Sequence, residues 1–361
     1  MTAAVFLFRA GRRERLAAAG PTEFLYGYAE LARDGAPVAM FDEIDLGLDR
    51  PFNRLLEGAA NRFAQLVGFH ARIVARLLAR RRLLRGNGTL VATTHTLGFA
   101  LAMLRRLGAV RESLVIMTMG IVPTGASPVR LRWLRWLLGG TTLAVLSKPE
   151  AIWLRTALGE HVDIIDFTFG VDLEFWRPAT GGGENFAISV GNDWNRDFAT
   201  LVDAWRPHFP PLEIITSLPV TAGKSNIRVT RGDWRKQVIS DEDLRARLQR
   251  ARLVVVPLHD TLQPSGQSAA LQAMACGRPV ILTENRGCWD KQMLARHHAC
   301  RFVAPGDSTA LANAIEGLLA ERAQAEAMGA RARRMLEQED VSARAMADQF
   351  RAIIPALRTT A

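Results

Sequence analysis

Residues 264–283 read Pro-Ser-Gly-Gln-Ser-Ala-Ala-Leu-Gln-Ala-Met-Ala-Cys-Gly-Arg-Pro-Val-Ile-Leu-Thr, and the prediction of the fold begins with them. The preceding residues 253–256, Leu-Val-Val-Val, form an uninterrupted apolar run that is typical of a strand buried on both faces of a parallel sheet. Residues 280–283 have the same character. Between the two strands we expect a helix over 269–276, with Ser268 as its N-cap and Gly277 at its end.

The loop before this helix is a candidate anion site. A helix that starts beyond the carboxyl end of a parallel strand directs unpaired backbone N–H groups and the positive end of its dipole outward. Gly266 leaves room for a phosphate to approach the backbone of Gln267 and Ser268. Gln272 lies one turn later on the face of Ser268, where its side chain could reach a ribose hydroxyl. The alternative is a plain packing turn, which every α/β protein contains.

The run Leu-Gln-Ala-Met-Ala-Cys-Gly-Arg-Pro-Val-Ile at 271–281 resembles the donor-site helix of the group 1 (family 4) nucleotide-sugar glycosyltransferases. In that family two Glu residues, separated by seven others, precede Ala-Met-Ala-Cys-Gly-x-Pro-Val. Pro264 and Gln272 occupy these two positions here, so both carboxylates are missing. The resemblance implies the GT-B architecture, an α/β fold class with two doubly wound, Rossmann-like domains facing each other across a cleft. It also implies a nucleoside-diphosphate sugar in the second domain.

Length and composition agree with two domains. The chain has 361 residues and 48% hydrophobic residues, enough for two large cores. We expect an acceptor-binding domain at 1–178, a donor-binding domain at 179–340, and a final helix at 341–361 that crosses back to the first domain. No apolar run approaches the length of a membrane span, and arginines directly follow the first apolar residues, which is the reverse of a signal peptide. The sequence therefore predicts a cytoplasmic protein.

The net charge of +10 is concentrated in residues 1–178, which hold 23 Lys and Arg against 16 Asp and Glu. Such an excess suits an anionic partner, either nucleic acid or an anionic membrane face. Residues 61–85 are predicted as one amphipathic helix with Arg72, Arg76 and Arg80 on a common face. We expect no nucleic-acid binding, because the basic segments carry Leu and Trp instead of spaced stacking residues or a reading helix.

Residues 129–138, Val-Arg-Leu-Arg-Trp-Leu-Arg-Trp-Leu-Leu, are a candidate membrane contact. Drawn as a helix, they place Arg132 and Arg135 on a polar stripe beside Trp133 and Trp136, with leucines on an apolar face. This composition is typical of a segment in the lipid headgroup layer. It predicts peripheral binding at the inner face of the cell membrane and a lipid-linked or cell-envelope glycan acceptor. The alternative is that both tryptophans are buried against the first sheet.

His95 directly follows the predicted strand 89–94. A histidine at the carboxyl end of a parallel strand can exchange a proton with a sugar hydroxyl or hydrogen-bond to it. A helix-capping histidine is the alternative. In the resembling family a strand ending in His opens the same helix, which implies a catalytic role.

Arg196 is the second candidate catalytic residue, in the loop that begins with Gly191 after the predicted strand 186–190. The resemblance places it at the family position of a Lys that holds the donor diphosphate, while Asn192 replaces the family's Arg. One guanidinium can still clamp a phosphate. As an alternative, Arg196 pairs with Asp193 or Asp197 on the surface.

The sequence thus predicts transfer of a glycosyl group from a nucleoside-diphosphate sugar to an acceptor hydroxyl. Stabilisation of the departing diphosphate by Arg196 and by the backbone near Gly266 would supply most of the catalysis. We expect no metal site and no cofactor other than the co-substrate, and by resemblance a retaining reaction. Two alternatives stay open: a non-catalytic scaffold or partner subunit that has lost the donor-site carboxylates, and a sugar-nucleotide epimerase of the same fold.

Overall fold

The computed structural model describes residues 2–18, 20–48, 68–179, 184–232 and 239–358. The chain forms two compact units. Unit 1 comprises Met1–Phe169 and Ala343–Ala361, and unit 2 comprises Gly170–Ser342. The first boundary therefore follows Phe169, whereas we placed it after residue 178.

Unit 1 is built on a parallel sheet in the order β2-β1-β3-β4-β5-β6. Its strands are β1 (Ala4–Phe8), β2 (Val38–Asp42), β3 (Thr89–Ala92), β4 (Ser113–Thr118), β5 (Thr142–Val145) and β6 (Asp163–Asp166). The order reverses between β1 and β3, because β2 lies on one side of β1 and all later strands lie on the other. In open α/β sheets, ligands bind outside the carboxyl ends of the strands at such a reversal.

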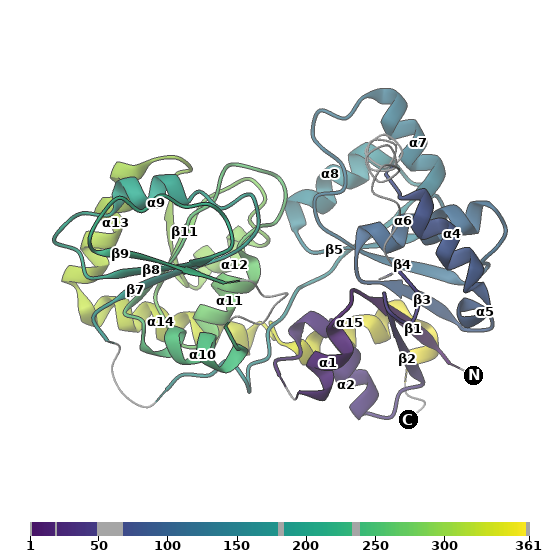
Figure 1. Cartoon of the computed structure of the whole chain (residues 1–361), viewed down its shortest axis with the longest axis horizontal. Coiled ribbons are helices and arrows are strands. Elements are labelled where there is room, and N and C mark those ends of the chain that lie inside the picture. Colours follow the sequence, from purple (N-terminus) through teal and green to yellow (C-terminus); the bar gives the residue numbers. More distant parts are fainter. Residues whose placement is uncertain (1, 19, 49–67, 180–183, 233–238, 359–361) are drawn as a thin grey trace. The chain divides into compact units, whose positions relative to one another are not determined.

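Helices cover both faces of this sheet. They are α1 (Arg12–Ala17), α2 (Tyr28–Arg33), α4 (Ala71–Ala79), α5 (Arg81–Leu84), α6 (His95–Arg106), α7 (Pro128–Leu138), α8 (Lys148–Leu158) and α15 (Ala343–Ile353), with 3-10 turns η1 (Glu23–Leu25) and η2 (Pro355–Leu357). Figure 1 shows α4 and α6 on one side of the strands and α2 and α15 on the other.

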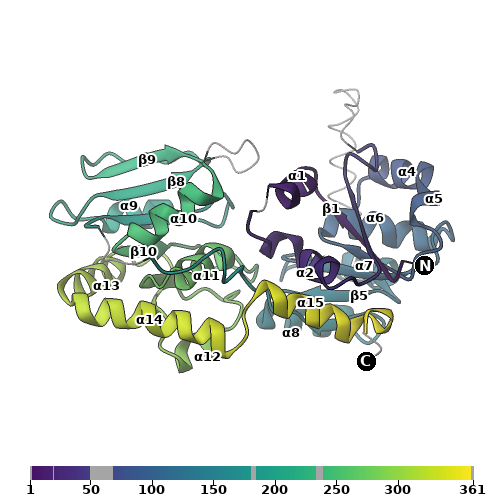
Figure 2. The same ribbon diagram turned by 90° about the horizontal axis from the view of Figure 1, so that it is seen from below.

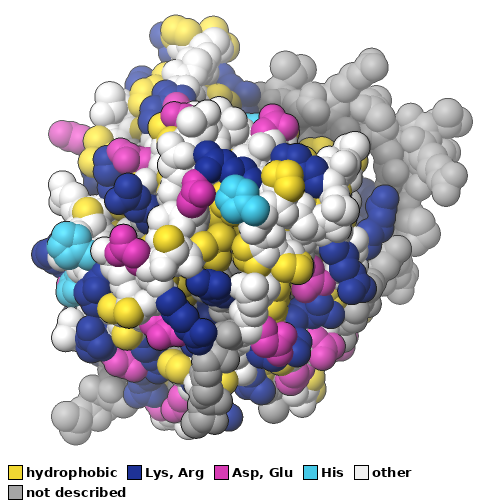
Figure 3. Space-filling view, turned by 90° about the vertical axis from the view of Figure 1, so that its left-hand side faces the viewer, with side chains coloured by type: hydrophobic (Ala, Val, Ile, Leu, Met, Phe, Trp, Pro, Cys, Tyr) yellow, Lys and Arg dark blue, Asp and Glu magenta, His cyan; other side chains and the backbone are white. Residues whose placement is uncertain are grey.

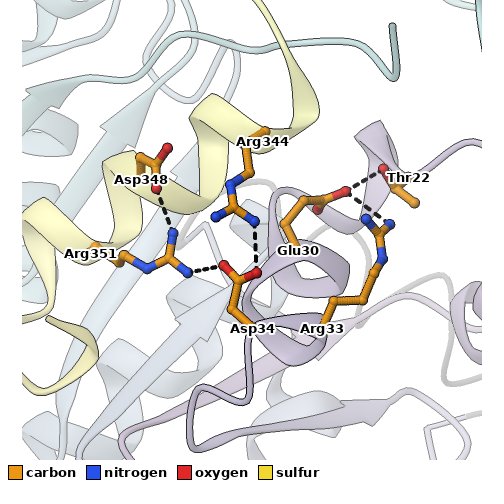
Figure 4. Close-up of polar contacts among 7 residues, drawn as sticks. All are labelled: Thr22, Glu30, Arg33, Asp34, Arg344, Asp348 and Arg351. Atoms are coloured by element: carbon orange, nitrogen blue, oxygen red, sulfur yellow. Dashed lines mark hydrogen bonds and ion pairs between the residues drawn. The ribbon is translucent and has the colours of Figure 1, made fainter. Parts of the chain in front are cut away.

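The C-terminal helix α15 belongs to the core of unit 1. Phe350 contacts Phe6 of β1 and Phe167, in both cases with 5.0 Å between ring centroids. Gly27, with φ +81°, lets α2 approach α15 closely, since a Cβ there would lie 2.5 Å from the backbone nitrogen of Ala347. At the surface, Asp34 accepts hydrogen bonds from Arg344 and Arg351 of α15, which lowers the pKa of Asp34 (Figure 4).

Unit 2 has a parallel sheet in the order β12-β11-β10-β7-β8-β9, which reverses between β7 and β10. Its strands are β7 (Ala187–Val190), β8 (Leu212–Thr216), β9 (Ile227–Arg231), β10 (Leu253–Val256), β11 (Val280–Thr283) and β12 (Arg301–Val303). Its helices are α9 (Phe198–Ala204), α10 (Asp241–Arg250), α11 (Gln267–Ala275), α12 (Lys291–Arg296), α13 (Ser308–Ala320) and α14 (Arg322–Gln338). Figure 2 shows the long α14 running beside α11 along one side of this unit, and the two helices are in contact.

The segment after β1 contains the helix α1, the turn η1 and the helix α2, and η1 is separated from α2 at Tyr26 and Gly27, which both have positive φ. One predicted helix has different bounds in the structure. The helix expected over 61–85 begins, within the described residues, only at Ala71 and ends at Ala79, with the short α5 following Arg80. Residues 61–67 of that segment lie outside the described residues.

No helix among the described residues combines the length and the apolar character that a membrane span requires.

Candidate functional site

The reversal point of the unit 2 sheet brings two loops together. One loop follows β7 and contains residues 191–197, and the other follows β10 and leads into α11. They are tied to each other by the side chain of Asn195, which donates a 2.8 Å hydrogen bond to Ser265 Oγ, and by the N–H of His259, which donates to the Asn195 carbonyl at 2.9 Å. The candidate donor-binding residues therefore lie on a rigid frame at the expected edge of the sheet.

Arg196 is the central side chain of this frame. It is 6% exposed, and its Nε donates a 2.8 Å hydrogen bond to Asp193 Oδ2. Burial lowers the pKa of Arg196, against the influence of Asp193, which raises it. The Nη1 atom is buried and has no hydrogen-bond partner among the described residues. A buried guanidinium with one unused donor is costly unless a ligand completes it.

Two glycines make room for this guanidinium. A Cβ on Gly191 would lie 2.1 Å from Arg196 Nε, and a Cβ on Gly266 would lie 3.1 Å from Arg196 Nη1 and 2.6 Å from Val256 Cγ1. Gly266 also has φ +73°, a left-handed conformation that suits glycine. Both predicted positions are thus brought against Arg196, and the need for glycine comes from the packing of this side chain as well as from space for a ligand.

The start of α11 differs by two residues from the prediction. Gly266, and not Ser268, is the N-cap, and no side chain caps this end, so the N–H groups of Gln267 and Ser268 are in the first turn. Gln267 and Gln272 are each 6% exposed, in a helix whose other side chains are almost all buried. Ser268 and Gln272 share a face of α11, as the spacing predicted.

The sequence did not indicate what Asn192 does. Its side-chain amide accepts a 2.6 Å hydrogen bond from the N–H of Ser217 and donates a 2.9 Å bond to the carbonyl of Gly232. It therefore holds the ends of β8 and β9 beside the loop after β7. Trp194 was also overlooked; it is 80% exposed, two residues before Arg196, where its ring is free to stack on a ligand.

The surface pairing that we considered as an alternative for Arg196 is only half present. Asp193 does pair with Arg196, but the arginine is buried. Asp197 instead caps α9, because its carboxylate accepts hydrogen bonds from the N–H of Thr200 at 3.0 Å and from the Thr200 hydroxyl at 2.6 Å.

His95 lies at the reversal point of the other sheet, as the first residue of α6 behind β3. Thr94 is the N-cap of this helix and accepts a hydrogen bond from the N–H of Leu97 at 3.4 Å, so His95 is not the capping side chain. His95 is exposed, yet desolvation by neighbouring protein atoms, together with the positive charges of Arg9 and His70, lowers the pKa of its side chain. The neutral imidazole is therefore favoured near pH 7.

A basic cluster that was not among the predicted site residues accompanies His95. Arg9 follows β1 directly, and Arg12 and Arg15 lie on α1 with their guanidinium carbons 5.2 and 5.4 Å from the ring centroid of Phe24. Burial lowers the pKa of Arg12; Tyr26 opposes this, while Arg15 and Arg9 add to it. Positive potential thus converges at the carboxyl edge of β1 and β3.

The apolar face of α7 is not available to lipid. Leu134, Leu137 and Leu138 are buried in the core of unit 1, and Trp133 packs against this core with its ring 6.3 Å from that of Phe69. This part of the membrane prediction is wrong, because the leucine face of the amphipathic pattern points into the protein.

The opposite side of α7 remains exposed. Val129 is 80% and Trp136 is 46% exposed, and Arg132 is exposed between them, while Arg135 donates a 3.0 Å hydrogen bond to the carbonyl of Ala157. Arg80, the residue after α4, is exposed, whereas Arg76 of α4 donates a hydrogen bond to the carbonyl of Gly47 and is only half-exposed. The arginines predicted to face a membrane therefore do not form one free row.

The described residues contain no group of three or more His, Cys, Asp or Glu side chains placed to hold a metal ion. Cys276 and Cys288 are buried free thiols, and burial raises the pKa of each to about 12. Burial likewise raises the pKa of Cys300, which is half-buried. These thiols are therefore poor nucleophiles.

Comparison with known proteins places this geometry in context. Residues 219–321 match the family model described as glycosyl transferases group 1. No curated protein matches the chain. Among solved structures, sucrose-phosphate synthase from Thermosynechococcus elongatus has a TM-score of 0.68 at 18% identity, and 98% of each chain is covered.

Two further structures cover almost the whole chain. HepE from Anabaena, in complex with UDP and glucose, has a TM-score of 0.67 at 16% identity, with 98% of this chain and 100% of that chain covered. A glycosyltransferase from Rickettsia africae has a TM-score of 0.66 at 11% identity, with 99% of each chain covered. At these identities the likeness establishes the fold. The chain therefore has the GT-B fold, and its residues 219–321 match the model of the group 1 glycosyltransferases.

Proposed function

We propose that the chain transfers a sugar from a nucleoside-diphosphate sugar to an acceptor hydroxyl, and that Arg196 holds the diphosphate. The observation that carries this proposal is the buried, unpartnered Nη1 of Arg196 beside Gly266. The first turn of α11 adds backbone N–H groups and the positive end of a helix dipole at the same place. An anion there would satisfy both sets of donors.

This arrangement suits departure of a nucleoside diphosphate. As the bond between the sugar and the β-phosphate oxygen breaks, negative charge grows on the diphosphate, and a preformed cation and N–H groups stabilise it without reorganisation. The acceptor hydroxyl forms the new bond to the sugar and loses its proton. We propose that the reaction retains the anomeric configuration and needs no metal ion, since Arg196 supplies the positive charge at the leaving group.

Gln272 is proposed to hydrogen-bond the donor ribose from the same face of α11 as Ser268. An amide can donate to one hydroxyl and accept from another, so the loss of the Glu carboxylate removes charge and leaves hydrogen bonding. HepE has been crystallised with UDP-glucose, and we take uridine as the base for the first trial donor.

Unit 1 is proposed to bind the acceptor. His95, kept neutral by its surroundings, can accept the proton of the acceptor hydroxyl or orient it. Arg9 and Arg12 add positive potential near this edge. The acceptor that we propose is a glycan, either lipid-linked or part of the cell envelope.

A diphosphate titration tests the donor site. Isothermal titration calorimetry with UDP and with uridine should show that Arg196→Ala weakens UDP binding by about tenfold or more, with little effect on uridine. Arg196→Lys should recover part of the affinity because it retains the charge. Arg206→Ala is the matched control. Arg206 lies just after α9, is half-exposed and forms an ion pair with Glu316 of α13. Equal losses for UDP and uridine would argue against a phosphate contact.

The second candidate function is a non-catalytic scaffold or partner subunit of the same fold. Pro264 and Gln272, in place of two carboxylates, favour it. A wild-type protein that binds UDP but neither hydrolyses UDP-glucose nor transfers glucose to any added glycan would support the scaffold and contradict the transferase.

We propose that the chain contacts a membrane only through the exposed side of α7. Arg132 and Trp136, with Val129, remain accessible there, and the proposal no longer includes insertion of the leucines. It would place the chain at the cytosolic face of the membrane. Co-sedimentation with anionic vesicles at low salt tests it: Arg132→Ala/Trp136→Ser should reduce binding, and a wild-type protein that stays in the supernatant refutes it.

A further inference from the structure

A cavity in unit 2 lies at the amino ends of β10 and β11, whereas Arg196 lies at the carboxyl ends of the strands. It has a volume of about 550 Å³ and is lined by residues just before β10 and β11 and by one face of α14. Its charged side chains are five arginines and one glutamate: Arg252, Arg278, Arg322, Arg333, Arg334 and Glu326. Figure 3 shows one face of the unit on which Lys and Arg are interspersed with Asp and Glu, whereas arginine predominates among the charged residues of the cavity lining.

Two of these arginines are neutralised. Arg322 donates a 2.8 Å hydrogen bond to Glu326, and Arg333 donates a 2.7 Å bond to Glu337, which lies outside the cavity lining. The other three, Arg252, Arg278 and Arg334, have no carboxylate partner among the residues that the structure describes. Arg252 and Arg278 are half-buried and Arg334 is exposed, so three guanidinium groups without a carboxylate partner around one cavity favour the binding of an anion.

Arg252 and Arg278 are held in place by the protein. Arg252 donates a 2.8 Å hydrogen bond to Asn185 Oδ1 and another to the carbonyl of Leu319, while its Nε is buried without a partner in the described part of the chain. Arg278 makes only long hydrogen bonds to carbonyls, at 3.3 and 3.5 Å, and burial lowers its pKa. The guanidinium groups of Arg252 and Arg278 therefore retain N–H donors for a ligand and have lost part of their hydration.

The cavity results from a close contact between α14 and the turn after α11. Gly329 of α14 lies against Gly277, since a Cβ on Gly329 would be 2.2 Å from the carbonyl oxygen of Gly277. On either side of this contact, the small side chains of Ala325 and Ala330 leave the space open. The guanidinium groups of Arg278 and Arg334 are thus brought to one hollow from two elements.

This cavity is separate from the donor site. Gly277 follows the carboxyl end of α11, whereas Gly266 lies at its amino end, and nine helical residues span about 13 Å. A volume of about 550 Å³ lies within the range of small-molecule sites and exceeds the need of a single phosphate. Pro178, Pro279 and the arginine methylenes give the walls an apolar part that suits a ring.

We propose that this cavity binds a small phosphate-bearing anion with a sugar- or base-sized body. The proposal does not rest on the proposed transferase function, because it uses none of the residues around Arg196. The shared chemistry is a group of phosphate oxygens that accept from Arg252, Arg278 and Arg334. Free pyrophosphate and an organic phosphate are the two sources of such oxygens.

Calorimetry on the full chain tests the proposal with inorganic pyrophosphate and with ATP as probes. Arg278→Ala/Arg334→Ala should weaken binding of ATP by about tenfold or more. Arg278→Lys should give an intermediate loss, because a lysine keeps the charge but not the bidentate geometry. Arg111→Ala/Arg228→Ala removes the same charge from two exposed positions outside the cavity and should leave the affinity unchanged.

Hydrogen–deuterium exchange locates the bound probe. ATP should protect peptides from α14, over residues 322–334, and this protection should disappear in Arg278→Ala/Arg334→Ala. Tighter binding of ATP than of pyrophosphate would identify an organic phosphate as the ligand, and equal affinities would identify the phosphate groups alone. Absence of α14 protection at millimolar ATP in the folded wild-type protein, or protection that persists in the double variant, would overturn the proposal.

Discussion

Glu150 offers a test of the structure of unit 1 through the pH dependence of stability. It lies in the first turn of α8, is 1% exposed, and its Oε1 accepts hydrogen bonds from the N–H groups of Gly120 at 2.6 Å and Ile121 at 3.3 Å. Its Oε2 is buried and has no partner in the described part of the chain. The carboxyl group therefore connects α8 to the segment after β4, and its charge is poorly solvated.

Burial raises the pKa of Glu150 from its usual 4.5 to about 7, against the two backbone hydrogen bonds, which lower it. Between these pH values the folded chain keeps a proton that the unfolded chain has lost. The free energy of unfolding therefore falls as pH rises from about 4.5 to about 7 and stays low above this range. The difference between the two pKa values corresponds to a decrease of about 3 kcal/mol in the free energy of unfolding.

The variant Glu150→Gln removes this ionisation and keeps the shape of the side chain. Urea unfolding at about pH 5 and about pH 8 should show a loss of about 3 kcal/mol in the wild type that is absent in Glu150→Gln. Because the two units can unfold in separate transitions, the transition that the variant shifts is the one to compare. Glu160→Gln, at an exposed position just after α8, is the control and should keep the wild-type pH dependence. Parallel pH curves for wild type and Glu150→Gln would refute the argument.

Three further predictions concern the two reversal points. Gly191→Ala places a Cβ 2.1 Å from Arg196 Nε and should weaken UDP binding about as much as Arg196→Ala; unchanged affinity in calorimetry would contradict this. His95→Ala should lower transferase turnover by about 10²–10⁴ while UDP affinity stays constant, and a fully active variant would leave His95 a structural role. Gln272→Glu puts a carboxylate at a position that is 6% exposed and should lower the thermal midpoint of unfolding, which calorimetric scanning would detect.

The strands were predictable where their burial is complete. Residues 253–256 and 280–283 became β10 and β11 with the predicted bounds, because a strand covered on both faces needs apolar side chains throughout. We did not predict β6, which has the sequence Asp-Ile-Ile-Asp at 163–166. It is the outermost strand of its sheet, and both of its aspartates are exposed. Its identity depends on pairing with β5, which no local pattern encodes.

Backbone conformation limited the prediction of helix ends. Ser268 satisfies the usual rule for an N-cap, yet Gly266 starts α11, because its left-handed conformation brings the chain close to Val256 and Arg196. The helix α1, in the arginine-rich segment after β1, was also not predicted. None of its residues is buried, so apolar periodicity could not reveal it.

The error at α7 has a different cause. A helix that covers a sheet and a helix that lies on a bilayer both need one apolar face, so the pattern of leucines fits either. Burial of Leu134 and Leu138 decides for the protein core. Only the exposed positions, such as Trp136, can distinguish a helix that also contacts lipid from one that only covers the sheet. These positions contribute little to the apolar periodicity of the sequence.

The replacements at the candidate donor site together change its charge. The family pattern has two cations and two carboxylates, whereas this chain keeps Arg196 and has neutral residues at the other three positions. The side-chain amide of Asn192 donates a hydrogen bond to Gly232 and accepts one from Ser217, and it carries no charge to offer a phosphate. A single buried guanidinium, paired on one side with Asp193, is left with its free Nη1 toward Gly266. A bound diphosphate would supply the hydrogen-bond acceptor that Nη1 lacks, because few fixed charges compete for that donor. We therefore expect the affinity for a diphosphate to depend more on Arg196 than it would in a site where two cations bind the phosphates.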